Sequence, residues 1–364
     1  MDDLAPMRAA LALARRNLGA TWPNPAVGCV IVKEGRVVGR GSTQPGGRPH
    51  AETEALARAG GGAGGATAYV SLEPCSHHGR TPPCAEALIA AGIARIVVAV
   101  EDPDPRVSGR GIARLRAAGM TVETGFCAAE ASELNAGFFR RIEEGRPLVT
   151  LKLAASLDGR IATSAGESRW ITGPAARDRA HLLRATHDAV LVGTGTALAD
   201  DPRLTCRLPG LASRSPVRIV IDRQLRLPAT LRLLAEANEV PSWVVTLASA
   251  SPSRHVELAR QGVKLIPTDP DALGGIDLVA MLRRLGDEGL TRLLVEGGGR
   301  LAAALLRAGL VDRVVWMRAP LVIGGDGLPS VAALELGGLA GAPRFQLLSS
   351  EIADGDVIDT YRRL

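Results

Sequence analysis

A histidine, a glutamate and two cysteines at the ends of predicted elements constrain the fold more than any other feature of the sequence. Residues 49–60 read PHAETEALARAG, and residues 73–84 read EPCSHHGRTPPC. Cys75 directly follows a predicted apolar strand, whereas Cys84 follows a proline pair and opens a predicted helix. A chain that uses these side chains together must bring the end of that strand against the starts of two helices.

The donor set of His50, Cys75 and Cys84 is typical of zinc. One imidazole nitrogen and two sulfurs suit a tetrahedral Zn²⁺ with one open position, where the pKa of a water is lowered toward neutrality. Glu52 lies two residues from His50 and is better placed to take and deliver protons than to act as a fourth ligand. The dipole of the helix that begins at Cys84 favours a thiolate there. We therefore predict zinc ligation by His50, Cys75 and Cys84, with Glu52 as the catalytic acid and base.

The spacing of the two cysteines distinguishes this pattern from the common one. Zinc deaminases carry H-x-E followed by P-C-x-x-C. Here H-A-E and P-C are present, but the cysteines are nine residues apart and SHHGRTPP lies between them. Two alternatives stay open. Either the cysteines are buried structural residues beside a solvated glutamate, or His77 or His78 replaces His50 as the nitrogen ligand.

Composition limits the cellular compartments and the kinds of partner that we expect. The cysteines of this 364-residue chain are an odd, sparse set, which indicates a reducing compartment: Cys29, Cys75, Cys84, Cys127 and Cys206. The N-terminal segment lacks the pattern of a signal peptide, and no apolar stretch is long enough to span a membrane, so we expect a cytoplasmic protein. The formal net charge is +5, but the arginines are scattered and aromatic residues make up 3%, which argues against a nucleic-acid partner.

Helical and strand patterns alternate along the first third of the chain, which is typical of an α/β layered domain with a largely parallel sheet. In the first part, helices are predicted at 3–18, 51–60, 84–92, 111–119 and 128–145, and strands at 27–32, 36–41, 67–74 and 95–100. A new strand-led unit begins after Gly145, with further strands at 189–193, 217–222, 242–247, 292–298 and 313–320. The length suits two domains, and we place them at residues 1–145 and 146–364.

Three segments of the first domain resemble the deaminase half of the bifunctional riboflavin-biosynthesis deaminase/reductase family: TWPNPAVGCVIV, GRPHAE and EPCSHHGRTPPC. The resemblance implies a cytidine-deaminase-like three-layer domain that deaminates an aminopyrimidinone ribonucleotide. It assigns pyrimidine contact to Asn24 and substrate contact to Arg80, and it supports the zinc ligands and Glu52. Thr43 stands where the family usually has a substrate-contacting histidine, which puts the details of substrate binding in question.

The second domain has glycine-rich strand ends, VGTGTALADD and EGGGRLAAALL, and neither is a Rossmann fingerprint. Backbone N–H groups at such a junction can hold a phosphate, although a plain tight turn is the alternative for either one alone. In order along the chain, KLAASLDGRIA, GESRWITG, ADDPRLTCR and LLVEGGG resemble the reductase half of the same family. The resemblance implies a dihydrofolate-reductase-like domain that uses NADPH to reduce a ribosylamino to a ribitylamino group.

The resemblance also implies the residues of that site. It places Ala154, Trp170, Thr196, Asp200, Gly298 and Gly299 at NADPH, and Ser168, Arg184, Leu204, Arg207 and Glu296 at the substrate. The chemistry of the side chains agrees, because Arg184 and Arg207 can clamp a phosphate and Lys152, one of three lysines, can donate to a pyrimidinone carbonyl. Arg223 is a candidate for the 2′-phosphate of NADPH. Relatives self-associate through the reductase domain, so we expect a homo-oligomer.

Two other functions are weighed against this two-step enzyme. A nucleoside or RNA deaminase fused to an unrelated oxidoreductase would need a basic, aromatic face, which the sequence lacks. A non-catalytic nucleotide-binding module would be expected to have lost Glu52 or a metal ligand, and all of these residues are present.

Overall fold

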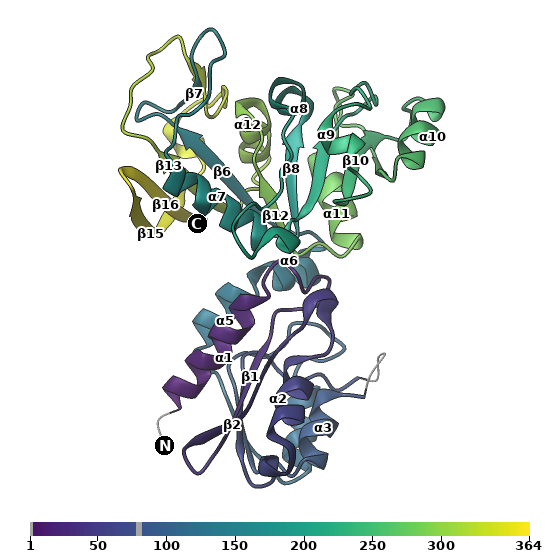
Figure 1. The fold of residues 1–364 in the computed structure, drawn as a ribbon, viewed down its shortest axis with the longest axis vertical. Coiled ribbons are helices and arrows are strands. Elements are labelled where there is room, and N and C mark those ends of the chain that lie inside the picture. Colours follow the sequence, from purple (N-terminus) through teal and green to yellow (C-terminus); the bar gives the residue numbers. More distant parts are fainter. Residues whose placement is uncertain (1–2, 78–81) are drawn as a thin grey trace. The chain divides into compact units, whose positions relative to one another are not determined.

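The computed structural model describes residues 3–77 and 82–364 and consists of two compact units, residues 1–145 and 146–364 (Figure 1). Each unit is built on its own β-sheet and has its own apolar core.

The sheet of the first unit has five strands in the order β2-β1-β3-β4-β5. Their bounds are β1 Gly28–Lys33, β2 Arg36–Ser42, β3 Thr67–Val70, β4 Arg95–Val98 and β5 Thr121–Thr124. The predicted hairpin of β1 and β2 is confirmed. Because β1 also pairs antiparallel with β3, only the β3–β4 and β4–β5 pairs are parallel. The expectation of a largely parallel sheet is therefore wrong for this unit.

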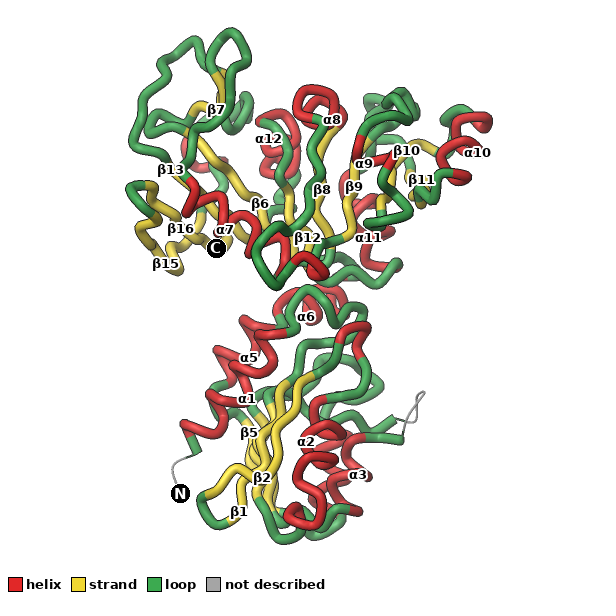
Figure 2. The backbone as a smooth tube through the Cα atoms, in the orientation of Figure 1, coloured by secondary structure: helices red, strands yellow, loops and turns green. Residues whose placement is uncertain are grey.

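Helices cover both faces of this sheet, which gives three layers (Figure 2). On one side lie α1 (Leu4–Arg16) and α5 (Ala128–Leu134), and on the other lie α2 (Ala51–Ala59), α3 (Cys84–Ala90) and α4 (Arg110–Ala117). Alternate residues of a strand point to opposite faces. Accordingly, Val30 and Val32 belong to the core under α1, whereas Cys29 and Ile31 belong to the core under α2 and α3. Two short 3-10 turns, Pro45–Gly47 and Gly60–Ala63, flank α2.

The single helix predicted at 128–145 is two helices, α5 and α6 (Ala136–Glu144). Asn135 lies between them and is 2% exposed. Its side-chain amide accepts from the Ala26 N–H (3.0 Å) and donates to the Ala26 carbonyl (3.1 Å). A buried asparagine that bonds to another segment of backbone favours a break in the helix rather than its continuation.

The sheet of the second unit has nine strands in the order β11-β10-β9-β8-β12-β6-β13-β16-β15. Their bounds are β6 Leu148–Ala155, β8 Ala189–Gly193, β9 Val217–Ile221, β10 Ser242–Leu247, β11 Lys264–Thr268, β12 Arg292–Val295, β13 Arg313–Arg318, β15 Phe345–Ala353 and β16 Asp356–Arg363. The pairs from β11 to β13 are parallel, and β13, β16 and β15 are antiparallel. The centre of this sheet is thus parallel, and its far end is antiparallel.

Helices pack on the second sheet, and a small separate ribbon adds two strands. The helices are α7 Pro174–Ala185, α8 Thr194–Asp200, α9 Arg232–Ala235, α10 Pro252–Arg260, α11 Leu278–Asp287 and α12 Gly299–Arg307, with 3-10 turns at Ala212–Arg214 and Leu339–Gly341. The ribbon pairs β7 (Arg160–Ala162) with β14 (Leu328–Pro329). Since β6, β8, β9 and β12 are parallel, their carboxyl ends meet at one sheet edge, which is where ligands bind in open α/β sheets.

Two of the strands that the sequence patterns do not indicate, β5 and β15, lie at sheet edges. β15 is exposed at seven successive positions, so it has no alternation of buried and exposed residues to reveal it. β5 is four residues long and mostly exposed. Both strands form by adding to an edge rather than by burying an apolar face.

We predict that Gly28→Ala destabilises the first unit. A Cβ at this position would lie 1.9 Å from the Ala10 carbonyl oxygen of α1, so α1 would have to move away from β1. Overpacking of this kind costs about 1–3 kcal/mol in the free energy of unfolding. Hydrogen exchange measured separately on peptides of the two units should show the loss in residues 3–145 alone. Gly61→Ala is the control, because no heavy atom lies within 4 Å of its Cβ position; equal effects of the two substitutions would contradict the packing argument.

Candidate active sites

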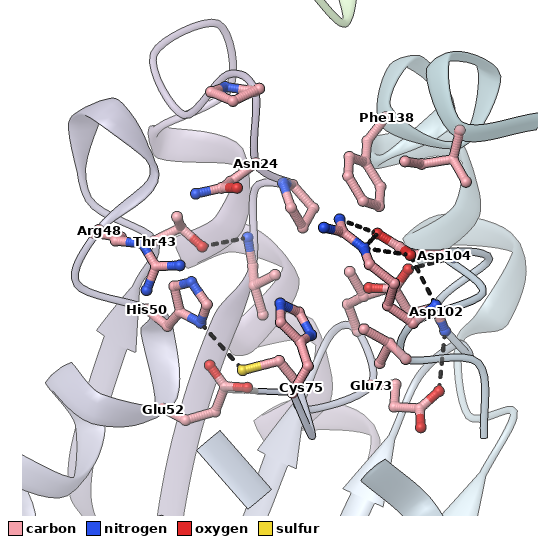
Figure 3. Close-up of a pocket in the computed structure, with 18 of the residues that line it drawn as sticks. Asn24, Thr43, Arg48, His50, Glu52, Glu73, Cys75, Asp102, Asp104 and Phe138 are labelled. Carbon is pink, nitrogen blue, oxygen red and sulfur yellow. Dashed lines mark hydrogen bonds and ion pairs between the residues drawn. The ribbon is translucent and has the colours of Figure 1, made fainter. Parts of the chain in front are cut away.

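The first site joins a strand end to two helix starts. His50 immediately precedes α2, Cys75 follows β3, and Cys84 is the first residue of α3. The potential ligand atoms of these three residues all lie within 4.8 Å of one another. His50 Nδ1 is 3.3 Å from Cys84 Sγ. It is 3.6 Å from Cys75 Sγ, and this second contact is drawn in Figure 3. Among the described residues, this is the one such group of histidine, cysteine and acidic side chains, and it includes His50 rather than His77.

One sulfur of the pair carries the negative charge more readily. Cys84 at the start of α3 donates its backbone N–H to Cys75 Sγ at 3.3 Å. Hydrogen bonding from Cys84 lowers the pKa of the Cys75 thiol to about 4, and the same interaction, with burial, raises the pKa of Cys84. The thiolate is therefore favoured at Cys75, not at Cys84 as the sequence alone suggests. The side chain of Cys84 makes the largest contribution, and the backbone N–H of Cys84 adds to it. Metal ligation would ionise both thiols.

Glu52 lies in the first turn of α2 and is 3% exposed. Burial raises the pKa of its carboxyl to about 7, and the Cys75 thiolate adds to the effect. In Figure 3 its carboxylate points toward Cys75, beneath His50. A carboxyl that titrates near neutral pH beside a potential metal site can both accept and return a proton.

A cavity of about 300 Å³ lies above this group and includes Asn24 and Thr43 in its wall. Asn24 donates its amide N–H to the Gly47 carbonyl at 3.0 Å, which leaves its side-chain oxygen as the acceptor available to a ligand. The Thr43 hydroxyl accepts the Val27 N–H at 3.0 Å. Arg80, a predicted substrate contact, lies outside the described residues, as does His78.

The same wall contains residues that sequence reasoning missed: Arg48, Asp102, Asp104, Arg106 and Phe138. Asp102 is 6% exposed, and burial raises the pKa of its carboxyl to about 6. Arg106 Nε lies 2.9 Å from the Asp104 carboxylate. A signal was present, because the acidic run EDPDPR follows the predicted strand at 95–100, and residues after a strand of a parallel sheet lie at the ligand-binding edge.

The second site is a cavity of about 720 Å³ in the reductase-like unit. It brings together ten of the predicted residues: Lys152, Ala154, Ser168, Trp170, Arg184, Thr196, Asp200, Leu204, Arg207 and Glu296. The Gly298 N–H donates to the Thr196 hydroxyl at 3.1 Å, and Gly299 is the first residue of α12. The glycine-rich turn thus lies against the cavity although it contributes no lining side chain.

A buried carboxylate organises this cavity. Glu296 follows β12, and its oxygens accept from Arg184 Nε (2.6 Å) and Nη2 (2.9 Å), with Lys152 Nζ at 3.8 Å. Burial alone would raise the pKa of Glu296, but Arg184 and Lys152 outweigh burial and lower it to about 2. Burial lowers the pKa of Lys152, which Glu296 opposes. Because Arg184 also donates to the Thr205 carbonyl, its guanidinium is held in place by the protein.

The cavity rim includes Trp170, which is 67% exposed, so this ring is not part of the core. The Arg177 guanidinium lies 4.6 Å from the centre of the ring. His181, which sequence reasoning missed, also lines the cavity, with Nδ1 3.1 Å from the Thr205 carbonyl oxygen. It lies one turn before Arg184 on α7, so the two side chains share one face of that helix.

Arg223 lies apart from the other predicted cofactor residues. It lines a separate cavity of about 850 Å³ at the carboxyl end of β9, together with Arg226 and Arg307. Its Nη1 donates to the Gly274 carbonyl at 2.9 Å. Thr194 lines this cavity and Thr196 lines the other, so the first turn of α8 separates the two.

Family models match both units. Residues 1–100 match the cytidine and deoxycytidylate deaminase zinc-binding region, and residues 147–358 match the RibD C-terminal domain. The riboflavin biosynthesis protein RibD of Escherichia coli is 46% identical over 95% of this chain and 95% of its own length. The chain belongs to the RibD family.

Solved structures of RibD proteins extend this result over the whole chain. Acinetobacter baumannii RibD aligns with a TM-score of 0.89 at 40% identity, covering 100% of this chain and 99% of that one. The Thermotoga maritima structure aligns with a TM-score of 0.86 at 34% identity, covering 99% and 98%. The chain is thus a bifunctional deaminase/reductase of riboflavin biosynthesis, with a cytidine-deaminase-like N-terminal domain and a RibD reductase domain. Since one family spans both units, a fusion of unrelated enzymes is not favoured. No helix in the described part of the chain is long and apolar enough to cross a membrane.

We predict that Cys84→Ser removes bound zinc. The substitution takes one of three soft donors from the group, and a change of ligand should weaken zinc binding more than about 100-fold. Elemental analysis of the purified protein, followed by competition with a chelator, measures this. Cys127→Ser is the matched control, because Cys127 lies in the same unit outside the ligand group. Full zinc content in Cys84→Ser would mean that other residues hold the metal.

Proposed function

We propose that the chain carries out two successive steps on one phosphorylated aminopyrimidine. The first unit deaminates 2,5-diamino-6-(ribosylamino)-4(3H)-pyrimidinone 5′-phosphate, and the second reduces the ribosyl side chain of the product with NADPH. The observation that carries the proposal is the buried Glu52 beside the His50, Cys75 and Cys84 group. The Thermotoga maritima relative, named a diaminohydroxyphosphoribosylaminopyrimidine deaminase and 5-amino-6-(5-phosphoribosylamino)uracil reductase, supports the choice of substrate.

His50, Cys75 and Cys84 would hold zinc in the first unit. Their one nitrogen and two sulfurs fit this ion, and three protein ligands leave a position open. Bound zinc supplies a Lewis acid that makes water acidic near neutral pH. Glu52 accepts a proton from the attacking water and delivers it to the departing amino group, which leaves as ammonia while the ring carbon becomes a carbonyl. A pKa near 7 allows Glu52 to hold the proton between these two transfers.

Substrate recognition in the first unit depends on residues around the cavity mouth. Asn24 presents its side-chain oxygen to an N–H group of the pyrimidine, because its amide nitrogen is engaged by Gly47. Arg80 contacts the substrate from the loop between the zinc cysteines. Thr43 is too short to reach as far as the histidine that relatives have at its position, so other residues of the wall must replace that contact.

The second unit positions the carbonyl and phosphate groups of its substrate. Bound NADPH supplies the hydride, which adds to the sugar carbon attached to nitrogen. Lys152 donates to the pyrimidinone carbonyl, and Glu296, held by Arg184, accepts from the ring N–H groups. Arg207 binds the phosphate, with Ser168 and Leu204 also facing the substrate. The reaction also requires a proton for the sugar oxygen that is released as the ring opens, and Asp200 lies in the cavity to supply it.

Residues along the sheet edge would hold the cofactor. Ala154 and Trp170 would contact its nicotinamide, and Thr196, Gly298 and Gly299 would contact its phosphates. Arg223, in the cavity beyond the first turn of α8, would bind the 2′-phosphate that distinguishes NADPH from NADH. Homo-oligomer formation and a cytoplasmic location remain predictions from the sequence.

A coupled assay with Glu52→Gln tests the deaminase half. The glutamine amide cannot shuttle a proton, so ammonia release should fall by about 10²–10⁴-fold, while zinc content and reduction of the already deaminated substrate stay near wild type. Ammonia and NADPH consumption are followed on the diaminopyrimidinone ribonucleotide, and ammonia should appear first. Loss of both activities together would overturn the assignment of the two reactions to separate sites.

Lys152→Met tests the reductase half. Loss of the ammonium removes the donor to the pyrimidinone carbonyl, so reduction should slow by roughly 10²-fold while deamination is unchanged. Lys264→Met is the control, since Lys264 lies in the same unit with its side chain 44% exposed. If deamination falls as far as reduction, Lys152 is a structural residue.

A further inference from the structure

The loop that follows β4 forms one wall of the deaminase cavity. Asp102, Asp104, Arg106 and Val107 line the cavity, and all of them lie beyond the zinc-binding region matched at residues 1–100. The residues that would bind the metal and the residues of this wall thus lie in separate parts of the chain. What holds the wall in place therefore bears on which substrate the site accepts.

A single buried carboxylate holds the start and the end of this loop. Glu73 is 4% exposed and lies two residues before Cys75. Its Oε2 accepts the N–H groups of Asp102 (3.2 Å) and Gly109 (2.9 Å), and its Oε1 accepts the N–H of Ile112 (3.1 Å). Gly109 and Ile112 belong to the start of α4, and Gly109 has no side chain to cap that helix. Glu73, in the segment after β3, therefore caps α4 and holds the two ends of the loop together.

Hydrogen bonds continue from Glu73 along the loop to a guanidinium. The Asp102 carboxylate accepts the Asp104 N–H at 2.8 Å, and the Asp104 carboxylate accepts the Arg106 N–H at 2.9 Å. The Arg106 side chain then pairs with the Asp104 carboxylate (Figure 3). Each link fixes the next residue of the wall, so the position of the Arg106 guanidinium depends on Glu73 through two intervening aspartates.

Gly111 also supports the contact between α4 and the segment that contains Glu73. A Cβ at Gly111, in the first turn of α4, would lie 2.1 Å from the Pro74 carbonyl oxygen and 3.1 Å from Glu73 Oε1. Only a residue without a side chain lets α4 approach the segment between Glu73 and Cys75 this closely. Gly111, which has no side chain, thus lies against the buried Glu73 carboxylate.

We propose that Glu73 is a positioning residue that fixes the loop of residues 101–109 as the substrate-recognising wall of the deaminase cavity. It acts through the loop, because its own oxygens are occupied by three backbone N–H groups. This inference rests on the proposed deamination of a pyrimidine ribonucleotide. Glu73 then determines how well the substrate is bound, and Glu52 determines how fast bound substrate reacts.

Glu73→Gln is the primary test. Glutamine has one acceptor oxygen, and its NH₂ group would face backbone N–H groups, so the loop should loosen. We expect the KM for ammonia release to rise at least about tenfold with kcat within about threefold, and zinc content and reductase activity unchanged. Hydrogen exchange should accelerate at residues 102–112 and not in α1. Glu130→Gln, an exposed carboxylate of the same unit, should leave all of these measurements at wild-type values.

Gly111→Ala provides an independent test through the same contact. It should displace the start of α4 and produce the same rise in KM, whereas Gly61→Ala should not, because no atom lies within 4 Å of its Cβ position. An unchanged KM in both Glu73→Gln and Gly111→Ala overturns the proposal. A fall in kcat at constant KM, or loss of zinc or of folding in both variants, also overturns it and makes Glu73 a structural residue.

Ammonia release by the wild-type protein distinguishes failure of this inference from failure of the proposed function. If wild-type protein releases no ammonia from the diaminopyrimidinone ribonucleotide, the proposed function fails. Hydrogen exchange at residues 102–112 then still decides whether Glu73 holds the loop. If wild-type protein is active and Glu73→Gln has normal kinetics and normal exchange, the proposed function stands and the role of Glu73 is wrong.

Discussion

The cost of burying a carboxylate shapes both units. An ionised carboxyl group away from water must be neutralised by a cation, hydrogen-bonded by several donors, or protonated. Three glutamates illustrate these outcomes. Glu296 is neutralised by Arg184 and Lys152, Glu73 accepts three backbone N–H groups, and Glu52 has little compensation, so its pKa rises to about 7. The two compensated carboxylates hold structure in place, and the uncompensated one is suited to proton transfer.

The arrangement of the first site follows from where elements begin and end. β3 delivers Cys75 at its carboxyl end, and α2 and α3 begin at that same edge, next to His50 and at Cys84. Helix starts present unpaired N–H groups, and one of these groups stabilises the Cys75 sulfur. The same edge of the sheet also carries the loop after β4, so the metal group and the substrate wall are brought together by strand order alone.

The sequence predicted those parts of the molecule whose signals are local. The β1–β2 hairpin, the central strands of the second sheet and the cluster of His50, Cys75 and Cys84 each follow from a short pattern of residues. The predictions were weaker where a long-range contact decides the outcome. Asn135 breaks a helix by bonding to Ala26, and the pKa of Cys75 is lowered by hydrogen bonds from the side chain and backbone of Cys84, nine residues away. Neither contact has a signature in the residues around it.

Local sequence patterns also did not predict the edge strands or which residues line the same cavity. β15 has no buried face to reveal it, and chain order does not show that Arg223 lines a different cavity from the other predicted cofactor residues. The wall residues after β4 were missed although an acidic run marks them. Such a run has the same composition as an ordinary exposed loop, and only the fold shows that Asp102 is buried.

The two cavities differ in how much of the chain each one needs. All residues that line the deaminase cavity lie between Pro23 and Ile142, whereas the reductase cavity needs Lys152 from β6 and Glu296 from the end of β12. During synthesis from the N-terminus, every residue of the first cavity has been added before β6 emerges from the ribosome. The second cavity lacks its central carboxylate until most of the chain has been made, and until then Lys152 and Arg184 have no counterion in it. Ribosomal synthesis therefore completes the residues of the deaminase cavity before those of the reductase cavity. This is also the order in which the two reactions take place.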